Sequence, residues 1–235
     1  YVIPSWWDSN WLVISTSHSG NTEEAIEATE TALKAGATVI VISTGGILAG
    51  LAELHYNCHL ITSIGGQPPR SAFGHIFSRQ IALFRSLGIL PYSDEDDQML
   101  TRLQAVVEEY DFINNQDSDL LELISYLETQ PISLLGPTEL SPVLTRFKNQ
   151  INENSARFAK IGTFPEMNHN ESVAWGGVGN NRDFTSSEQV ILFITWNGMH
   201  SWVLKRREGM IAHTPGELAW KIHGEGNTLL EAMLH

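Results

Sequence analysis

The chain has 235 residues, of which 42% are hydrophobic and 17% charged, so it can bury one large core or two modest ones. Its formal net charge of −13 argues against nucleic acid as a partner, because phosphate backbones require a basic protein surface. The single cysteine, Cys58, excludes an internal disulfide, and the sequence has neither an apolar run that could cross a bilayer nor the blocks of a signal peptide. We therefore expect a cytoplasmic protein with no membrane partner.

Two apolar runs rich in β-branched residues, at 11–15 and 38–43, predict buried parallel strands. The segment between them has apolar residues at helical spacing, glutamates in its first turn and Gly36 as its stop, so the three parts form a right-handed βαβ unit. The pattern continues with a short helix, a strand, a glycine- and proline-rich loop and a longer helix, at 47–54, 59–64, 65–69 and about 71–87. We predict one doubly wound α/β domain over residues 1–92.

An acidic helical region follows, with eleven carboxylates against the single Arg102 between residues 93 and 128. The helical spacing of its apolar residues predicts connecting helices over 93–129. We expect the carboxylates of this linker to lie on a solvated face. A second α/β pattern then fills 130–235, with a strand, a turn, a helix, a loop and a strand predicted at 131–136, 137–142, 143–162, 163–172 and 189–195. The predicted fold class is α/β, with two tandem doubly wound parallel-sheet domains joined by acidic helices.

The stretch STSHSGNTEEA, residues 15–25, places hydroxyl groups between the first predicted strand and the first predicted helix. A helix that begins at the carboxyl end of a parallel strand offers unpaired N–H groups and a partial positive charge to an anion. We predict that Ser17, Ser19 and Thr22 donate hydrogen bonds to a phosphate, while Gly20 lets the backbone approach closely. The alternative is that Ser19 or Asn21 simply caps the helix, because caps use the same residue types.

The stretch PEMNHNES, residues 165–172, gathers carboxylates, amides and an imidazole in what we predict to be a loop after a helix. Glu171 or Glu166 could serve as a general base and His169 as a proton shuttle, because enolisation beside a carbonyl needs a well-placed carboxylate. The alternative is a network of turn and capping contacts with a solvated histidine. We predict no metal site here, since no third ligand lies at a recognisable spacing.

Two further residues are candidates by position. Arg70 follows two prolines and opens a predicted helix, so it could project from a stiff loop and stabilise a substrate oxygen. His200 also lies beyond the carboxyl end of a predicted strand. The alternative for Arg70 is an ordinary surface arginine, and the alternative for His200 is that it is simply one solvated histidine of the nine in the chain.

Four motifs, SHSGNTEE, PPRSAFGHIF, FKNQINENSARFA and PEMNHNE, occur in this order around the acidic linker. With them the chain resembles the bifunctional phosphoglucose/phosphomannose isomerases, which are built from two sugar-isomerase (SIS) domains. The resemblance implies an aldose–ketose isomerase that interconverts glucose 6-phosphate and mannose 6-phosphate with fructose 6-phosphate through an enediol(ate). It implies no metal and no organic cofactor.

The resemblance also implies roles for individual residues. The serine-threonine loop binds the sugar phosphate, which here falls on Ser17, Ser19 and Thr22. Arg70 would support the enediolate, and Glu171 would move the proton between C1 and C2. A histidine from the neighbouring subunit would assist ring opening; His200 is the best match and His169 the alternative. The resemblance thus implies a homodimer with an active site shared between its subunits.

Two rival functions follow from the same motifs. A non-catalytic sugar-phosphate sensor would keep the phosphate loop without the chemistry, and an amidotransferase would need a glutaminase domain. The presence of both Arg70 and Glu171 favours the isomerase over the sensor. The family also has a glycine-rich strand and loop ahead of Tyr1 and a segment beyond His235, so we expect both domains here to lack a terminal part.

Overall fold

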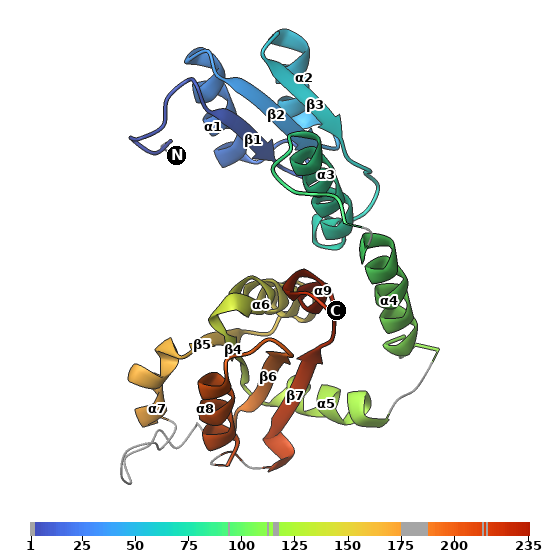
Figure 1. Ribbon diagram of the computed structural model, residues 1–235, viewed down its shortest axis with the longest axis vertical. Coiled ribbons are helices and arrows are strands. Elements are labelled where there is room, and N and C mark those ends of the chain that lie inside the picture. The colour runs from blue at the N-terminus through green and yellow to red at the C-terminus, as the bar shows by residue number, and fades with distance from the viewer. Residues whose placement is uncertain are drawn as a thin grey trace. The chain divides into compact units, whose positions relative to one another are not determined.

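The computed structural model describes residues 3–93, 95–111, 113–114, 118–174, 188–212, 214 and 216–235. The chain divides into two compact units, Tyr1–Ser93 and Asp94–His235. Figure 1 shows that each unit is built on its own sheet with helices packed around it, and every strand pair in both sheets is parallel. The predicted α/β class with parallel sheets is confirmed.

The first unit has a three-stranded sheet in the order β1-β2-β3. Its strands are β1 (Leu12–Thr16), β2 (Thr38–Ser43) and β3 (Cys58–Thr62). Its helices are α1 (Glu23–Lys34), α2 (Gly46–Leu54) and α3 (Phe73–Ser86), the last preceded by the 3-10 turn η1 (Pro69–Ser71). Each strand except the last is followed by a helix that returns the chain, so the predicted βαβ unit and its continuation are confirmed.

Helix α1 carries the end signals that the sequence analysis used. Its first turn holds Glu23 and Glu24 and its last turn Lys34, charges that complement the helix dipole. Gly36 follows with a φ of 86°, in the left-handed region that favours glycine. On the sheet, the alternate residues Val39 and Val41 are fully buried and belong to the same core cluster as residues of α1 and α2.

The second unit has a four-stranded sheet in the order β5-β4-β6-β7. Its strands are β4 (Ile132–Pro137), β5 (Ala159–Phe164), β6 (Val190–Trp196) and β7 (Ala219–Gly224). Its helices are α4 (Glu95–Glu109), α5 (Ser118–Thr129), α6 (Ser141–Ser155), α7 (Glu171–Ala174), α8 (Ser201–Ile211) and α9 (Leu229–Leu234). Short 3-10 turns are η2 (Thr138–Leu140), η3 (Glu166–His169) and η5 (Gly216–Leu218).

Two core clusters cover the two faces of the second sheet, because neighbouring strand residues point to opposite sides. Leu134, Leu192 and Leu144 belong to a cluster that includes residues of α5, α6 and α9. Leu135 and Phe193 belong to the other cluster, which includes Phe164, Met167 and residues of α8. The strands β4 and β6 are buried almost throughout and form the centre of this unit.

One predicted element of the second unit is wrong. The helix predicted over 143–162 ends at Ser155, and the chain turns at Ala156 with a φ of 51°. Residues 159–164 then form β5, a strand at the edge of the sheet, so the 165–172 stretch follows a strand and not a helix. β7, α8 and α9 were not predicted. The connecting helices predicted over 93–129 are α4 and α5, which fall within the second unit, although residues 94, 112 and 115–117 of that range lie outside the described ones.

Candidate functional site

The loop after β1 forms a cradle of hydroxyl groups at the N-terminus of α1. Ser17 Oγ lies 2.8 Å from Thr22 Oγ1 and accepts a hydrogen bond from the Gly20 N–H at 3.1 Å. Thr22 is the N-terminal flanking residue of α1, and its side chain makes no capping hydrogen bond. The N–H groups of the first helical turn therefore have no side-chain cap, as a site for an anion requires.

The alternative in which Ser19 or Asn21 caps α1 is wrong. Ser19 Oγ accepts from the Asn21 N–H at 3.2 Å, and Asn21 Oδ1 accepts from the Ile47 N–H at 3.1 Å, so neither side chain reaches the helix end. The second of these bonds joins the cradle to the first turn of α2. Gly20, with a φ of 69°, lets the cradle approach the loop after β2 closely. A Cβ at this position would overlap the Gly45 carbonyl oxygen and lie 2.7 Å from Ser43 Oγ.

The loop after β3 brings Arg70 to the same end of the first sheet. Arg70 lies in the 3-10 turn η1, directly before α3, rather than in the first turn of the predicted helix. Two residues of this region escaped the sequence analysis. His18 Nε2 contacts the Gln67 carbonyl oxygen of this loop at 3.2 Å, and the buried hydroxyl of Ser63 has no hydrogen-bond partner among the described residues. His18 lies inside the SHSGNTEE motif and Ser63 lies outside the motifs, and neither has a further signal in the sequence.

The 165–171 segment starts at the carboxyl end of β5 and is fixed by Met167, which is 2% exposed and packs in a core cluster of the second unit. Thr138 Oγ1 donates to the Phe164 carbonyl at 2.8 Å and ties the segment to the end of β4. Glu171 begins the short helix α7, and its Oε2 lies 2.5 Å from Lys160 Nζ of β5. His169 is exposed in the turn η3.

The other histidine predicted to act, His200, is the N-terminal cap of α8. Its Nδ1 accepts a hydrogen bond from the Trp202 N–H at 3.3 Å. The structure therefore places Ser17, Ser19, Thr22 and Arg70 at one end of the first sheet, and Glu171, His169 and His200 beyond strand ends of the second.

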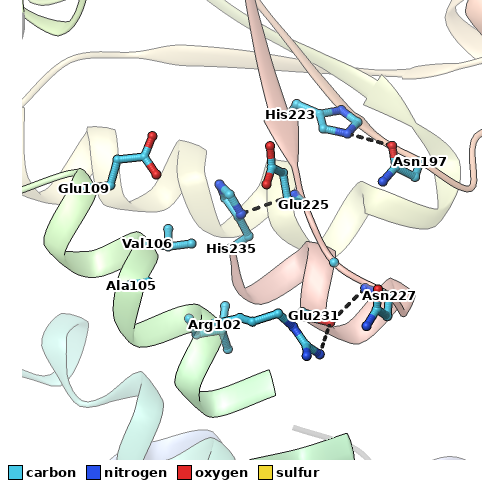
Figure 2. Close-up of a pocket in the computed structure, with 12 residues that line it drawn as sticks. Arg102, Ala105, Val106, Glu109, Asn197, His223, Glu225, Asn227, Glu231 and His235 are labelled. Carbon is cyan, nitrogen blue, oxygen red and sulfur yellow. Dashed lines mark hydrogen bonds and ion pairs between the residues drawn. The ribbon is translucent and has the colours of Figure 1, made fainter. Parts of the chain in front are cut away.

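The second unit has a pocket of about 600 Å³. Figure 2 shows residues that line it, from α4, the end of β7 and α9. Several of its polar groups pair with one another. Arg102 of α4 makes two contacts with the Glu231 carboxylate, at 2.5 and 3.0 Å, and the Asn227 N–H donates to the same carboxylate at 2.8 Å. His223 Nε2 lies 3.0 Å from Asn197 Oδ1.

The contact between Arg102 and Glu231 shifts the pKa of both residues. Hydrogen bonding to Arg102, and then to the Asn227 N–H, lowers the pKa of Glu231, while Glu231 raises the pKa of Arg102. Glu231 is only 3% exposed, so its carboxylate needs these partners. We infer that the paired side chains of this pocket serve to hold α4 against α9. The sequence analysis gave it no role.

The arrangement limits the chemistry available. Among the described residues no group of three or more His, Cys, Asp or Glu side chains could hold a metal ion. Burial raises the pKa of the Cys58 thiol, which makes it a poor nucleophile. In the part of the chain that the structure describes, no helix is long and apolar enough to span a membrane. The groups placed for chemistry are the anion cradle of the first unit and, in the second unit, the Glu171 carboxylate with Lys160 beside it.

The chain is similar in sequence to several named proteins. The chain is 35% identical over 178 residues to a bifunctional phosphoglucose/phosphomannose isomerase of Caldicellulosiruptor bescii, which covers 74% of this chain and 52% of that protein. It is 28% identical over 235 residues to the protein of the same name from Thermoplasma acidophilum, covering 100% of this chain and 69% of that one. The chain thus spans about half the length of the first relative.

A solved structure supports the fold. The crystal structure of glucosamine-6-phosphate deaminase from Thermotoga maritima matches with a TM-score of 0.60 at 16% identity, and the match covers 99% of this chain and 68% of that one. Residues 118–235 match the model of the bacterial phospho-glucose isomerase C-terminal SIS domain, which is half of the chain. The chain therefore belongs to the bacterial phosphoglucose isomerase family of SIS-domain proteins.

Proposed function

We propose that the protein is an aldose–ketose isomerase that interconverts glucose 6-phosphate and mannose 6-phosphate with fructose 6-phosphate. The observation that carries the proposal is the cradle before α1, where Ser17 and Thr22 hydroxyls lie 2.8 Å apart beside a helix end without a side-chain cap. A phosphate dianion suits such a site, because hydroxyls and first-turn N–H groups both donate to it. Family membership favours an isomerase over an unrelated anion-binding protein.

In the proposed reaction Glu171 is the general base. Its carboxylate accepts the proton from C2 of the aldose, which leaves an enediolate, and returns that proton to C1 to give the ketose. Because Lys160 Nζ contacts Oε2, we assign the proton transfer to Oε1. Arg70 would stabilise the negative charge that develops on the substrate oxygens, and binding of the remote phosphate would orient the reacting carbons.

We further propose that both units are SIS-type domains and that the protein acts as a homodimer with an active site shared between subunits. The ring-opening histidine would be His200 of a neighbouring subunit, with His169 as the alternative. Because His200 Nδ1 already accepts from the Trp202 N–H, its Nε2 is the nitrogen that would face the sugar. A shared site would make activity depend on protein concentration, which dilution followed by a rate measurement tests.

The decisive experiment is proton NMR of fructose 6-phosphate in heavy water with the full-length protein. We expect deuterium at C2 of newly formed glucose 6-phosphate and mannose 6-phosphate. Glu171→Gln should abolish this exchange and leave phosphate binding nearly intact, because the amide cannot accept the proton. Glu166→Gln, the same change five residues earlier in an exposed turn, is the matched control and should keep wild-type activity.

The rival function predicts a different result. A sugar-phosphate sensor would bind fructose 6-phosphate in the same cradle, yet neither aldose would form and no deuterium would enter. An isomerase with another base would exchange deuterium equally well in the wild type and in Glu171→Gln.

A further inference from the structure

His18 connects three loops at the carboxyl end of the first sheet. It lies within the cradle, the loop after β1. Its carbonyl oxygen accepts from the Thr44 N–H at 3.0 Å and from Thr44 Oγ1 at 2.7 Å, in the loop after β2. Its ring Nε2 contacts the Gln67 carbonyl oxygen at 3.2 Å, in the loop after β3. One residue therefore links the cradle to both neighbouring loops.

The ring contact has a defined direction. A carbonyl oxygen can only accept, so Nε2 of His18 must carry the proton and donate it to Gln67. Nδ1 of the same ring is buried without a hydrogen-bond partner among the described residues. A buried polar atom left unpaired is costly, so its presence in a folded protein calls for an explanation.

The loop that His18 holds leads directly to Arg70. Only Pro68 and Pro69 separate Gln67 from Arg70. The proline rings fix φ at both positions, and Pro68 has a φ of −58°. Ser71 Oγ and the Ser71 N–H both bond the Pro68 carbonyl, at 2.9 and 3.0 Å, and close the turn. Because this segment is stiff, a displacement at Gln67 is carried to the backbone of Arg70.

We propose that His18 is a positioning residue that sets the place of Arg70 relative to the phosphate cradle. This proposal rests on the proposed function, since it gives Arg70 a part in turnover. Phosphate bound in the cradle would then be held at a fixed distance from the arginine that supports the reacting end. Loss of the ring contact would leave the phosphate contacts in place and misalign the arginine, so it would lower kcat more than it weakens phosphate binding.

The test compares two variants of His18 in the full-length protein. The amide nitrogen of His18→Gln reaches about as far as Nε2 and can still donate to Gln67, whereas the shorter His18→Asn cannot. We expect His18→Asn to lower kcat for fructose 6-phosphate by about 10- to 100-fold, as for a misplaced catalytic group. Its Kd for inorganic phosphate should change little, and His18→Gln should restore most of kcat.

A second readout does not depend on activity. In the wild type, inorganic phosphate titrated into nitrogen-15-labelled protein should shift the backbone amide signals of Gly65 and Gly66, in the loop after β3. In His18→Asn those shifts should vanish, while the Gly20 shift in the cradle remains.

Three outcomes would overturn the proposal: unchanged kcat in His18→Asn, an equal loss of kcat and phosphate affinity, or no difference between the two variants. If the wild type turns over no sugar phosphate, the proposed function fails, and the amide shifts alone decide whether His18 couples the two loops.

Discussion

Gly20→Ala tests whether the close approach of two loops builds the cradle. Gly20 has a φ of 69°, where an alanine costs about 1–2 kcal/mol. The new Cβ would also overlap the Gly45 carbonyl oxygen and lie 2.7 Å from Ser43 Oγ. To relieve this overlap, the loop must move by about 1.5 Å to reach ordinary van der Waals contact.

That movement breaks the hydrogen bonds of Gly20 itself. Its N–H donates to Ser17 Oγ at 3.1 Å, and its carbonyl accepts from the Leu48 N–H at 3.0 Å. At about 1 kcal/mol for each bond, the total loss is about 3–4 kcal/mol, a large part of the stability of a small domain. Because Ser17 is displaced too, phosphate binding should be lost with it.

Gly36→Ala is the matched control, since Gly36 has a φ of 86° and a Cβ there would meet nothing within 4 Å. Gly36→Ala should lower the free energy of unfolding only by the cost of a left-handed alanine, about 1–2 kcal/mol, and leave phosphate binding intact. Hydrogen–deuterium exchange of the β1 and β2 peptides measures the stability of the first unit alone, and a phosphate titration by NMR measures binding. If Gly20→Ala loses no more stability than Gly36→Ala, the packing argument for the cradle is wrong.

Thr22→Val should weaken binding of inorganic phosphate by about tenfold or more, the value of one hydrogen bond to a charged group. Thr31→Val is the control, because the Thr31 hydroxyl donates to the Glu27 carbonyl on the exposed face of α1. It should leave phosphate affinity unchanged, and an equal loss of affinity in both variants would show that the anion binds elsewhere. Arg102→Met should destabilise the second unit and make its stability depend less on pH. Because Arg102 lowers the pKa of Glu231, the wild type has this stabilisation above about pH 4.3 and loses it as the pH falls through the lowered pKa. Urea unfolding at pH 7 and pH 3 measures this. The free energy of unfolding should fall less between the two pH values in Arg102→Met than in the wild type, and an equal fall in both proteins would contradict the prediction.

The elements with strong periodicity could be predicted from the sequence. The runs at 38–43 and 189–195 are almost wholly apolar, and the strands found there, β2 and β6, differ from prediction by at most one residue at either end. β5 could not be predicted, because AKIGTF contains a lysine and a glycine and directly follows a helical pattern. Its strand conformation comes from pairing with β4, which is a tertiary contact.

The candidate site divides in the same way. Ser17, Thr22 and Arg70 could be placed at one sheet edge, because a motif after a parallel strand fixes where side chains gather. The contact of His18 with Gln67 spans 49 residues, and that of Arg102 with Glu231 spans 129. Such contacts depend on how loops and helices pack, and periodicity in one sequence carries no information about them.

As the outer strand of the second sheet within the described residues, β5 presents a row of backbone groups onto which a strand of another copy could add. Lys160 is half-exposed on this strand, and its ammonium must shed water before any such strand docks. The lysine that pairs with Glu171 therefore also protects this edge strand against the addition of a strand from another copy. An apolar residue at position 160 would remove the ion pair and the barrier together, so loss of activity in such a variant must be separated from loss of monodisperse protein by light scattering.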